Sequence, residues 1–115
     1  MSKPFVRRYE GNPILTKDDI PYRVETVHNA GVVKLDGRYV MLFRSHLDTG
    51  RSLIGLAESE DGFRFKPRAE PFMVPSKEPI FAEYEAFGVE DPRITCLEGA
   101  YYITYSAYSA HGVRI

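Results

Sequence analysis

The sequence predicts an all-β protein, and three observations support this prediction. The apolar residues come in short runs separated by glycine or by acidic-glycine pairs, a texture more typical of strands than of helices. Tyr and Phe make up the whole aromatic content, 13% of the 115 residues. The chain also contains an internal repeat of paired strands, which indicates that its sheets are arranged around a common axis.

The first two strands form a predicted hairpin. Residues 31–35 lead into Asp36-Gly37, and residues 38–44 return. Asp-Gly supplies the positive φ angles that a two-residue hairpin turn requires. A second hairpin is predicted from residues 52–59 through the turn 60–62 into residues 63–66, which alternate apolar and basic side chains as an edge or half-buried strand does.

A proline-rich connector is predicted over residues 67–87. Four prolines recur there at intervals of four residues, which excludes a regular helix and denies a central strand its hydrogen-bond donors: Pro67, Pro71, Pro75 and Pro79. A third hairpin follows, with strands at 94–97 and 100–106 around Glu98-Gly99, and residues 112–115 read as a further strand.

The third hairpin repeats the first. Superposing Gly99 on Gly37, an offset of 62 residues, pairs apolar positions such as Leu35 with Leu97. A repeat of about four strands per unit is typical of a β-propeller, in which each blade covers its apolar faces with its neighbours. We therefore expect about one and a half to two blades, with hairpin repeats near 31–66 and 92–115. The alternative is a complete small β-sandwich whose two hairpins happen to look alike.

Composition excludes several classes of function. The 15 Lys and Arg residues nearly balance the 16 Asp and Glu residues, so no basic field is available to bind nucleic acid. No apolar run approaches the roughly 20 residues that span a bilayer, and the N-terminus lacks a secretory signal, so we expect a cytoplasmic protein without membrane contact. Cys96 is the only cysteine, which excludes an intrachain disulfide, and it is predicted to be buried.

The offset that aligns the hairpins also pairs Asn29 with Asp91, each expected just before the first strand of its unit. Equivalent positions in a propeller face the same end of the central channel, where polar groups converge on a ligand. Glu90 and Arg93 flank Asp91. One carboxyl, with its pKa raised by burial and by its acidic neighbour, is predicted to donate a proton to a leaving group. The alternative is an Arg93 salt bridge that pins the loop between blades.

Two further groups are candidate site residues. Arg44 ends its predicted strand and could point into the channel mouth as a hydrogen-bond donor, or it could lie solvated at the strand end. His28, His46 and His111 have no spacing that suggests a metal cluster, so no metal is predicted.

Taken together, the motifs resemble those of glycoside hydrolase family 130, the β-mannoside phosphorylases and related β-mannosidases. The matching segments run in order over nearly the whole chain: 8–15, 28–33, 39–44, 54–57, 59–62 and 88–95, the last containing Glu90-Asp91-Pro92-Arg93. The resemblance implies a five-bladed β-propeller, of which residues 1–115 are the N-terminal portion. It also implies that Asp91 is the catalytic acid and that Asn29 and Arg44 bind the mannose.

The activity implied by the resemblance is phosphorolysis of a β-mannoside oligosaccharide to α-mannose 1-phosphate with inversion. Inorganic phosphate is then the co-substrate, no other cofactor is needed, and the acid acts through a hydroxyl of the bound mannose. The residues that hold phosphate are expected beyond Ile115. Hydrolysis by a β-mannosidase of the same family, and a non-catalytic sugar-binding or assembly module, are the alternatives. Because one face of the second blade is expected to be open, the chain is also expected to form homo-oligomers.

Overall fold

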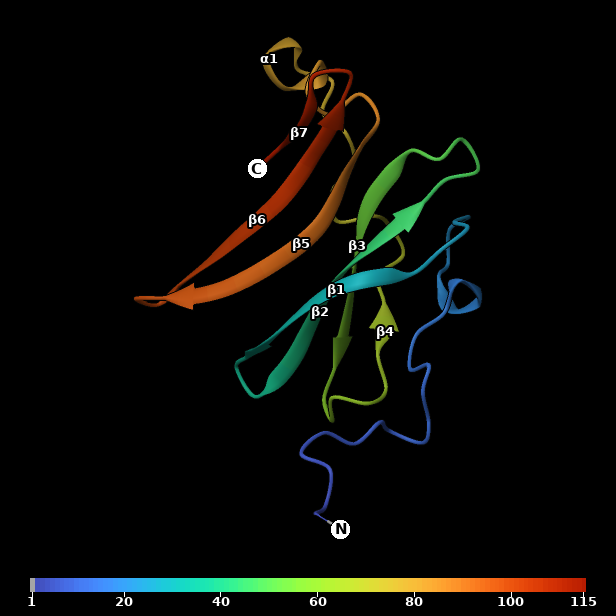
Figure 1. Cartoon of the computed structure of the whole chain (residues 1–115), viewed down its shortest axis with the longest axis vertical. Coiled ribbons are helices and arrows are strands. Elements are labelled where there is room, and N and C mark those ends of the chain that lie inside the picture. The colour runs from blue at the N-terminus through green and yellow to red at the C-terminus, as the bar shows by residue number, and fades with distance from the viewer. Residues whose placement is uncertain (1) are drawn as a thin grey trace.

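The structure, a computed structural model, describes residues 2–115 and confirms the all-β prediction (Figure 1). The seven strands are β1 (His28–Leu35), β2 (Arg38–His46), β3 (Ser52–Ser59), β4 (Lys66–Pro67), β5 (Gly88–Leu97), β6 (Ala100–Ser109) and β7 (Gly112–Arg114). Two single-turn helices, η1 (Lys17–Asp19) and α1 (Pro79–Ala82), interrupt the N-terminal segment and the connector. None of the helices within residues 2–115 is long and apolar enough to cross a membrane.

The strands form two antiparallel meanders. One contains β1 to β4, and the other contains β5, β6 and β7. A single parallel pairing, Ser52 with Gly88, joins β3 to β5 at the boundary between them. Figure 1 shows the second meander, in orange and red, leaning across the first, in teal and green. The first meander has the four strands of a propeller blade, and the second has three of them.

The 62-residue repeat extends to the backbone conformation. Both first strands carry a bulge, between His28 and Gly31 in β1 and between Glu90 and Arg93 in β5. The bulge residues Asn29 and Asp91 have φ angles of 49° and 52°, in the left-handed region that Asn and Asp tolerate better than most residues. The bulges turn these two side chains out of the regular alternation of their strands.

Three of the predicted features differ from the structure: the starts of two strands, the length of one strand and the content of the connector. Asn29 and Asp91 lie within β1 and β5 and not before them, because pairing resumes on both sides of each bulge. The strand predicted at 63–66 is reduced to β4, because Asp61 accepts hydrogen bonds from the backbone N–H groups of Phe63 and Arg64 and holds them in the turn. The connector contains α1, which begins at Pro79, where proline is compatible with a helix start.

The connector is fastened to the second blade by a buried carboxylate. Glu85 is 2% exposed, and its two oxygens accept hydrogen bonds of 2.6 Å each from the Tyr105 hydroxyl and the Ser76 backbone N–H. Burial, reinforced by this bond and by the charge of Glu85, raises the pKa of Tyr105 to about 12. The connector therefore holds a defined path despite its prolines.

Side-chain alternation in β2 and β3 divides the core into two layers. Met41, Phe43 and Leu53 face the N-terminal segment, where Leu15, Ile20 and Val24 cover them. Val40, Leu42, Ile54 and Leu56 face the second blade and pack against Val89 of β5. Because successive side chains of a strand point to opposite faces, Arg44 and Ser52, which share even numbering with the second layer, also face the second blade.

One face of β5, β6 and β7 carries exposed apolar side chains, among them Leu97, Tyr102, Tyr108 and Val113. Cys96 is exposed as well, so the prediction that it is buried is wrong. Its burial was predicted from the residue type alone, whereas Cys96 lies at the end of the β5–β6 hairpin, where residues 95–104 are all exposed.

The two first strands approach most closely at Gly31. A Cβ at this position would lie 2.8 Å from the backbone oxygen of Pro92, closer than real Cβ contacts. Pro92 and Gly31 are both buried. Only glycine therefore lets β1 and β5 come together beside Asn29 and Asp91.

We expect Gly31→Ala to lower the free energy of unfolding by about 1–3 kcal/mol, because the added methyl group forces two backbones apart. Chemical denaturation measures this change. Val32→Ala is the matched control at the next, half-exposed position, and its expected effect is within about 0.5 kcal/mol. Equal stability of Gly31→Ala and the native chain would contradict the close approach.

Candidate active site

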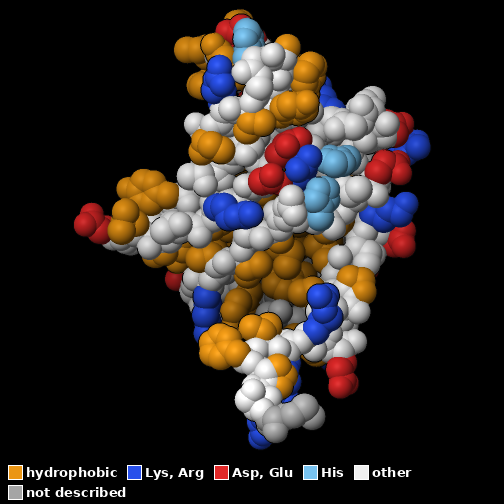
Figure 2. Space-filling view, viewed as in Figure 1, with side chains coloured by type: hydrophobic (Ala, Val, Ile, Leu, Met, Phe, Trp, Pro, Cys, Tyr) orange, Lys and Arg blue, Asp and Glu red, His pale blue; other side chains and the backbone are white. Residues whose placement is uncertain are grey.

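Arg44 is the centre of a polar cluster at the boundary between the two blades. Its Nη1 lies 3.1 Å from Asp91 Oδ1, and its Nη2 lies 2.9 Å from Glu90 Oε1. The Arg44 side chain is 18% exposed and that of Glu90 is 13% exposed, so the ion pairs are largely shielded from water. Figure 2 shows acidic, basic and histidine side chains gathered in one group on the face that it views. The interpretation of Arg44 as a solvated strand end is wrong.

Glu90 of the second blade is held by two donors of the first blade. Its Oε1 accepts the Arg44 bond and a hydrogen bond of 2.8 Å from the hydroxyl of Ser52, which is buried at the start of β3. A carboxylate with two such donors has little freedom to move. Glu90 therefore holds the Nη2 end of the Arg44 guanidinium in place.

Asn29 and Asp91, which the repeat pairs, are in direct contact. Asn29 Nδ2 donates to Asp91 Oδ1 over 2.9 Å, and Arg44 Nη1 donates to the same oxygen. The described residues thus bind Asp91 through Oδ1, which leaves Oδ2 available to a ligand. The sequence predicted that these three residues share one site, but it did not predict which of their atoms are bonded. The structure shows these bonds.

The direction of the Asp91 pKa differs from the prediction. Burial is the largest influence on this carboxyl and acts to raise its pKa, as expected. The hydrogen bonds from Asn29 and Arg44, together with the charges of Arg44 and Arg93, outweigh burial and leave the pKa below its ordinary value. In the unliganded protein Asp91 is therefore ionised at neutral pH.

Arg93 does not form the salt bridge that the alternative interpretation required. Its Nη1 donates to the backbone oxygen of Pro92 over 2.9 Å, and the residue is exposed. The ion pairs that join the blades come from Arg44 of the other blade. The interpretation failed because Arg44, and not Arg93, supplies the guanidinium that binds Glu90 and Asp91.

Three residues of the cluster were missed as contributors. Ser52 binds Glu90, and His46 Nε2 accepts a hydrogen bond of 3.1 Å from Arg44 Nε. The His28 ring packs edge-on against the His46 ring, with 5.0 Å between centroids. Burial, with the charges of Arg44 and His46, lowers the pKa of His28. Arg44 and His46 are two residues apart in one strand, so their side chains point to the same face. This spacing could have predicted that His46 lies in the cluster.

Comparison with known proteins now identifies the family. A family model described as β-1,4-mannooligosaccharide phosphorylase, glycoside hydrolase family 130, matches residues 2–115.

The chain belongs to glycoside hydrolase family 130. A β-1,2-mannobiose phosphorylase from Thermoanaerobacter sp. is 31% identical over 88% of this chain and 36% of its own length. The β-1,2-mannobiose phosphorylase of Listeria innocua, solved with β-1,2-mannobiose, superposes with a TM-score of 0.76 at 24% identity over 92% of this chain and 45% of its own. Its fold, a five-bladed β-propeller, confirms the propeller prediction, and the family 130 chain covers part of such a propeller.

A third relative bears on the type of reaction. It is a solved structure from family 130, whose mannoside phosphorylases are described as containing glycoside hydrolases that target β-1,2-mannosidic linkages in Candida mannan. It superposes with a TM-score of 0.82 at 26% identity, over 93% of this chain and 35% of its own. The family 130 chain thus spans about a third of the length of this structure and of the Thermoanaerobacter relative, and less than half of the Listeria structure.

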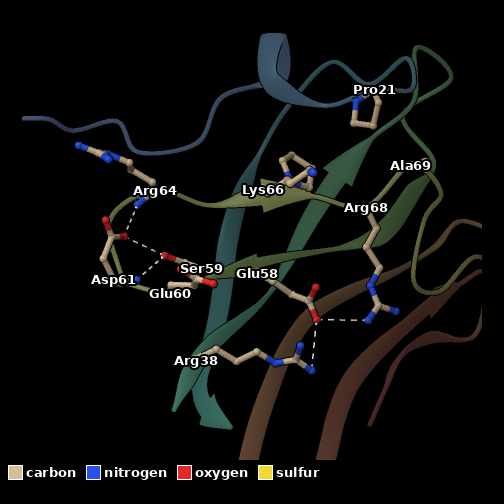
Figure 3. Close-up of a pocket in the computed structure, with 11 residues that line it drawn as sticks. Pro21, Arg38, Glu58, Ser59, Glu60, Asp61, Arg64, Lys66, Arg68 and Ala69 are labelled. Atoms are coloured by element: carbon tan, nitrogen blue, oxygen red, sulfur yellow. Dashed lines mark hydrogen bonds and ion pairs between the residues drawn. The ribbon is translucent and has the colours of Figure 1, made fainter. Parts of the chain in front are cut away.

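A pocket of about 790 Å³ lies away from this cluster, at the other ends of β2 and β3. Figure 3 shows two of its basic side chains, Arg38 and Arg68, both directed at Glu58. Asp61 is tied to Ser59 and to its own turn. None of the predicted site residues lines this pocket, so the candidate active site of the family 130 chain is the cluster around Arg44.

No metal-binding cluster of three or more His, Cys, Asp or Glu side chains occurs among residues 2–115. The acidic side chains of the site accept hydrogen bonds from Arg44, Asn29 and the Ser52 hydroxyl. The chemistry available from these residues is proton donation and hydrogen bonding to a polar ligand.

The low pKa of Asp91 predicts how stability depends on pH. The unfolded chain binds this proton more tightly than the folded one, so the contribution of ionised Asp91 is present above its ordinary pKa of 3.8 and is lost as the pH falls through the lower folded value. We expect the native chain to exceed Asp91→Asn in free energy of unfolding at pH 7, and the difference to shrink below pH 3.8. Denaturant titrations across this range measure it. A difference that grows on acidification would contradict the assignment.

Proposed function

We propose that the protein containing this chain catalyses phosphorolysis of β-mannosides, with Asp91 as the acid. The observation that carries the proposal is the contact of Asn29, Arg44 and Asp91 across the blade boundary in a member of family 130. In this reaction a β-mannoside and inorganic phosphate give α-mannose 1-phosphate and the shortened sugar. The named phosphorylases among the relatives support the choice of substrate class.

One bond breaks and one forms in the proposed step. A phosphate oxygen attacks the anomeric carbon from the face opposite the leaving group, so the configuration inverts, and the glycosidic carbon–oxygen bond breaks. The leaving oxygen receives the proton of Asp91, relayed through a mannose hydroxyl. One carboxyl suffices, because phosphate replaces the water that a second carboxylate activates in an inverting hydrolase.

Because Asp91 is partly exposed, substrate binding can change its surroundings and therefore its pKa. Its side chain is 35% exposed in the unliganded protein, where the pKa is low. A bound mannose would exclude water from Oδ2 and increase the cost of the charge, which raises the pKa toward the value that a general acid needs. Asp91 is thus proposed to take up its proton as the substrate binds.

Asn29 and Arg44 are proposed to bind the mannose beside Asp91. Both already donate to Asp91 Oδ1, which places the two groups beside the proposed acid. Planar amide and guanidinium groups are suited to the paired hydroxyls of a sugar. Glu90 is proposed to hold Arg44 in place, since its contacts go to Arg44 and Ser52. Arg93 is proposed to act on Asp91 through its charge alone.

Hydrolysis is the second candidate, and the hydrolases reported within family 130 favour it. The two activities differ in the attacking group, phosphate or water. The residues described here serve either one, because an acid and a mannose-binding pair are required by both.

Product analysis on the full-length protein tests the proposal. The protein is incubated with β-1,2- or β-1,4-mannobiose, with and without inorganic phosphate, and phosphorus NMR detects sugar phosphate. We expect α-mannose 1-phosphate only when phosphate is present, from at least one linkage. Free mannose at the same rate without phosphate would establish hydrolysis instead, and binding of mannobiose without any product would indicate a sugar-binding module.

A further inference from the structure

Each of the three nitrogens of Arg44 has its own partner. Nη1 bonds Asp91, Nη2 bonds Glu90, and Nε donates to His46 Nε2 over 3.1 Å. A guanidinium is planar, so a bond at Nε fixes the plane in which the other two nitrogens point. The contact with His46 therefore determines whether Arg44 can reach both carboxylates at once.

His46 is itself held in place. Its backbone N–H donates to the Thr26 hydroxyl over 3.0 Å, and its carbonyl accepts from the Glu25 N–H over 2.8 Å. The His28 ring packs against its ring edge-on. The end of β2 is thus fixed by the N-terminal segment and by β1, which gives the imidazole a defined orientation.

The bond also fixes the tautomer of His46. Nε2 can accept a hydrogen bond from Arg44 only if it carries no proton, so the proton of the neutral ring is on Nδ1. An imidazole protonated on Nε2 would place two donors against each other and would release Arg44 Nε.

We propose that His46 is a positioning residue, which orients Arg44 toward Asp91 and Glu90 by accepting its Nε proton. It acts through Arg44 and need not touch the substrate. The catalytic consequence rests on the proposed function, in which Arg44 binds mannose, but the orientation of Arg44 by His46 does not.

Two amide substitutions separate this role from simple packing. The amide oxygen of glutamine can reach the place of Nε2, whereas that of asparagine reaches only the place of Nδ1. We expect His46→Gln to retain mannobiose affinity within about 3-fold and His46→Asn to lose about 10-fold, the effect of one hydrogen bond to a charged group. His111→Gln is the control, because His111 lies in the β6–β7 turn beside Glu83, away from the site.

The experiment combines binding with a spectroscopic measurement on the full-length protein. Calorimetry with β-1,2-mannobiose measures the affinities, and long-range proton–nitrogen NMR of the native protein shows which His46 nitrogen carries the proton. An unprotonated Nε2 and rescue by Gln support the proposal. A protonated Nε2, or equal losses for Gln and Asn, would overturn it. The NMR result does not require turnover, so a protein without phosphorolytic activity but with an unprotonated Nε2 would overturn the proposed function alone.

Discussion

Replacing Asp91 with Asn in the full-length protein is expected to lower kcat/KM for phosphorolysis by about 100- to 10 000-fold, the contribution of a general acid. Asn cannot supply the proton that the leaving oxygen needs. It does keep an Oδ1 atom for the bonds from Asn29 and Arg44, and it tolerates the left-handed conformation of this position, with φ of 52°. The loss should therefore appear in kcat with the fold intact.

The sequence offers a matched control for this substitution. Asp36 lies in the β1–β2 turn, is exposed and has nearly the same backbone conformation, with φ of 50°. Asp36→Asn makes the same chemical change under the same backbone constraint, at a distance from the site. Steady-state kinetics should show a kcat/KM for Asp91→Asn that is about 100- to 10 000-fold below that of Asp36→Asn. Similar turnover by the two variants would show that Asp91 is not the acid.

Replacing Arg44 with Ala is expected to damage both stability and binding. Two carboxylates, Glu90 and Asp91, lose their shared cation, and Glu90 is 13% exposed. Breaking such a pair leaves an uncompensated charge, and after allowance for partial solvent contact we expect a loss of about 2–4 kcal/mol in the free energy of unfolding. The affinity for mannobiose should fall too, because the guanidinium that is proposed to bind the mannose is lost.

A double variant separates these two effects. Arg44→Met combined with Glu90→Gln removes the charge pair together, which should restore most of the stability without restoring mannobiose binding. Arg38→Ala is the control, because its pair with Glu58 is solvent-exposed and is worth at most about 1 kcal/mol. Denaturation and calorimetry give both quantities. Recovery of binding in the double variant would show that Arg44 serves only the fold.

The hairpins and the repeat could be predicted because they depend on local signals. Asp36-Gly37 and Glu98-Gly99 require turns wherever they stand between apolar runs, and the offset between them carries over to the bulges at Asn29 and Asp91. The ends of the strands could not be predicted in the same way. They depend on tertiary contacts, such as the hydrogen bonds of Asp61 that shorten β4.

The main residues of the site could be predicted from the sequence, but their hydrogen bonds and the direction of the Asp91 pKa could not. The repeat places Asn29 beside Asp91, but it does not indicate which oxygen is shared by two donors, and that arrangement reverses the expected direction of the Asp91 pKa. Ser52 and His46 were missed because a single serine or histidine carries no pattern. They acquire a role only when the register of β2 and β3 sets them on the same face as Arg44.

The role of Asp91 is tested most directly by comparing two substrates with the Asp91→Asn protein in the presence of phosphate. β-Mannobiose has a sugar leaving group that requires a proton, whereas 4-nitrophenyl β-mannoside has one that departs without it. If Asp91 is the acid, the variant loses far more activity on mannobiose than on the nitrophenyl mannoside, and both give α-mannose 1-phosphate. Equal losses on the two substrates would contradict proton donation by Asp91.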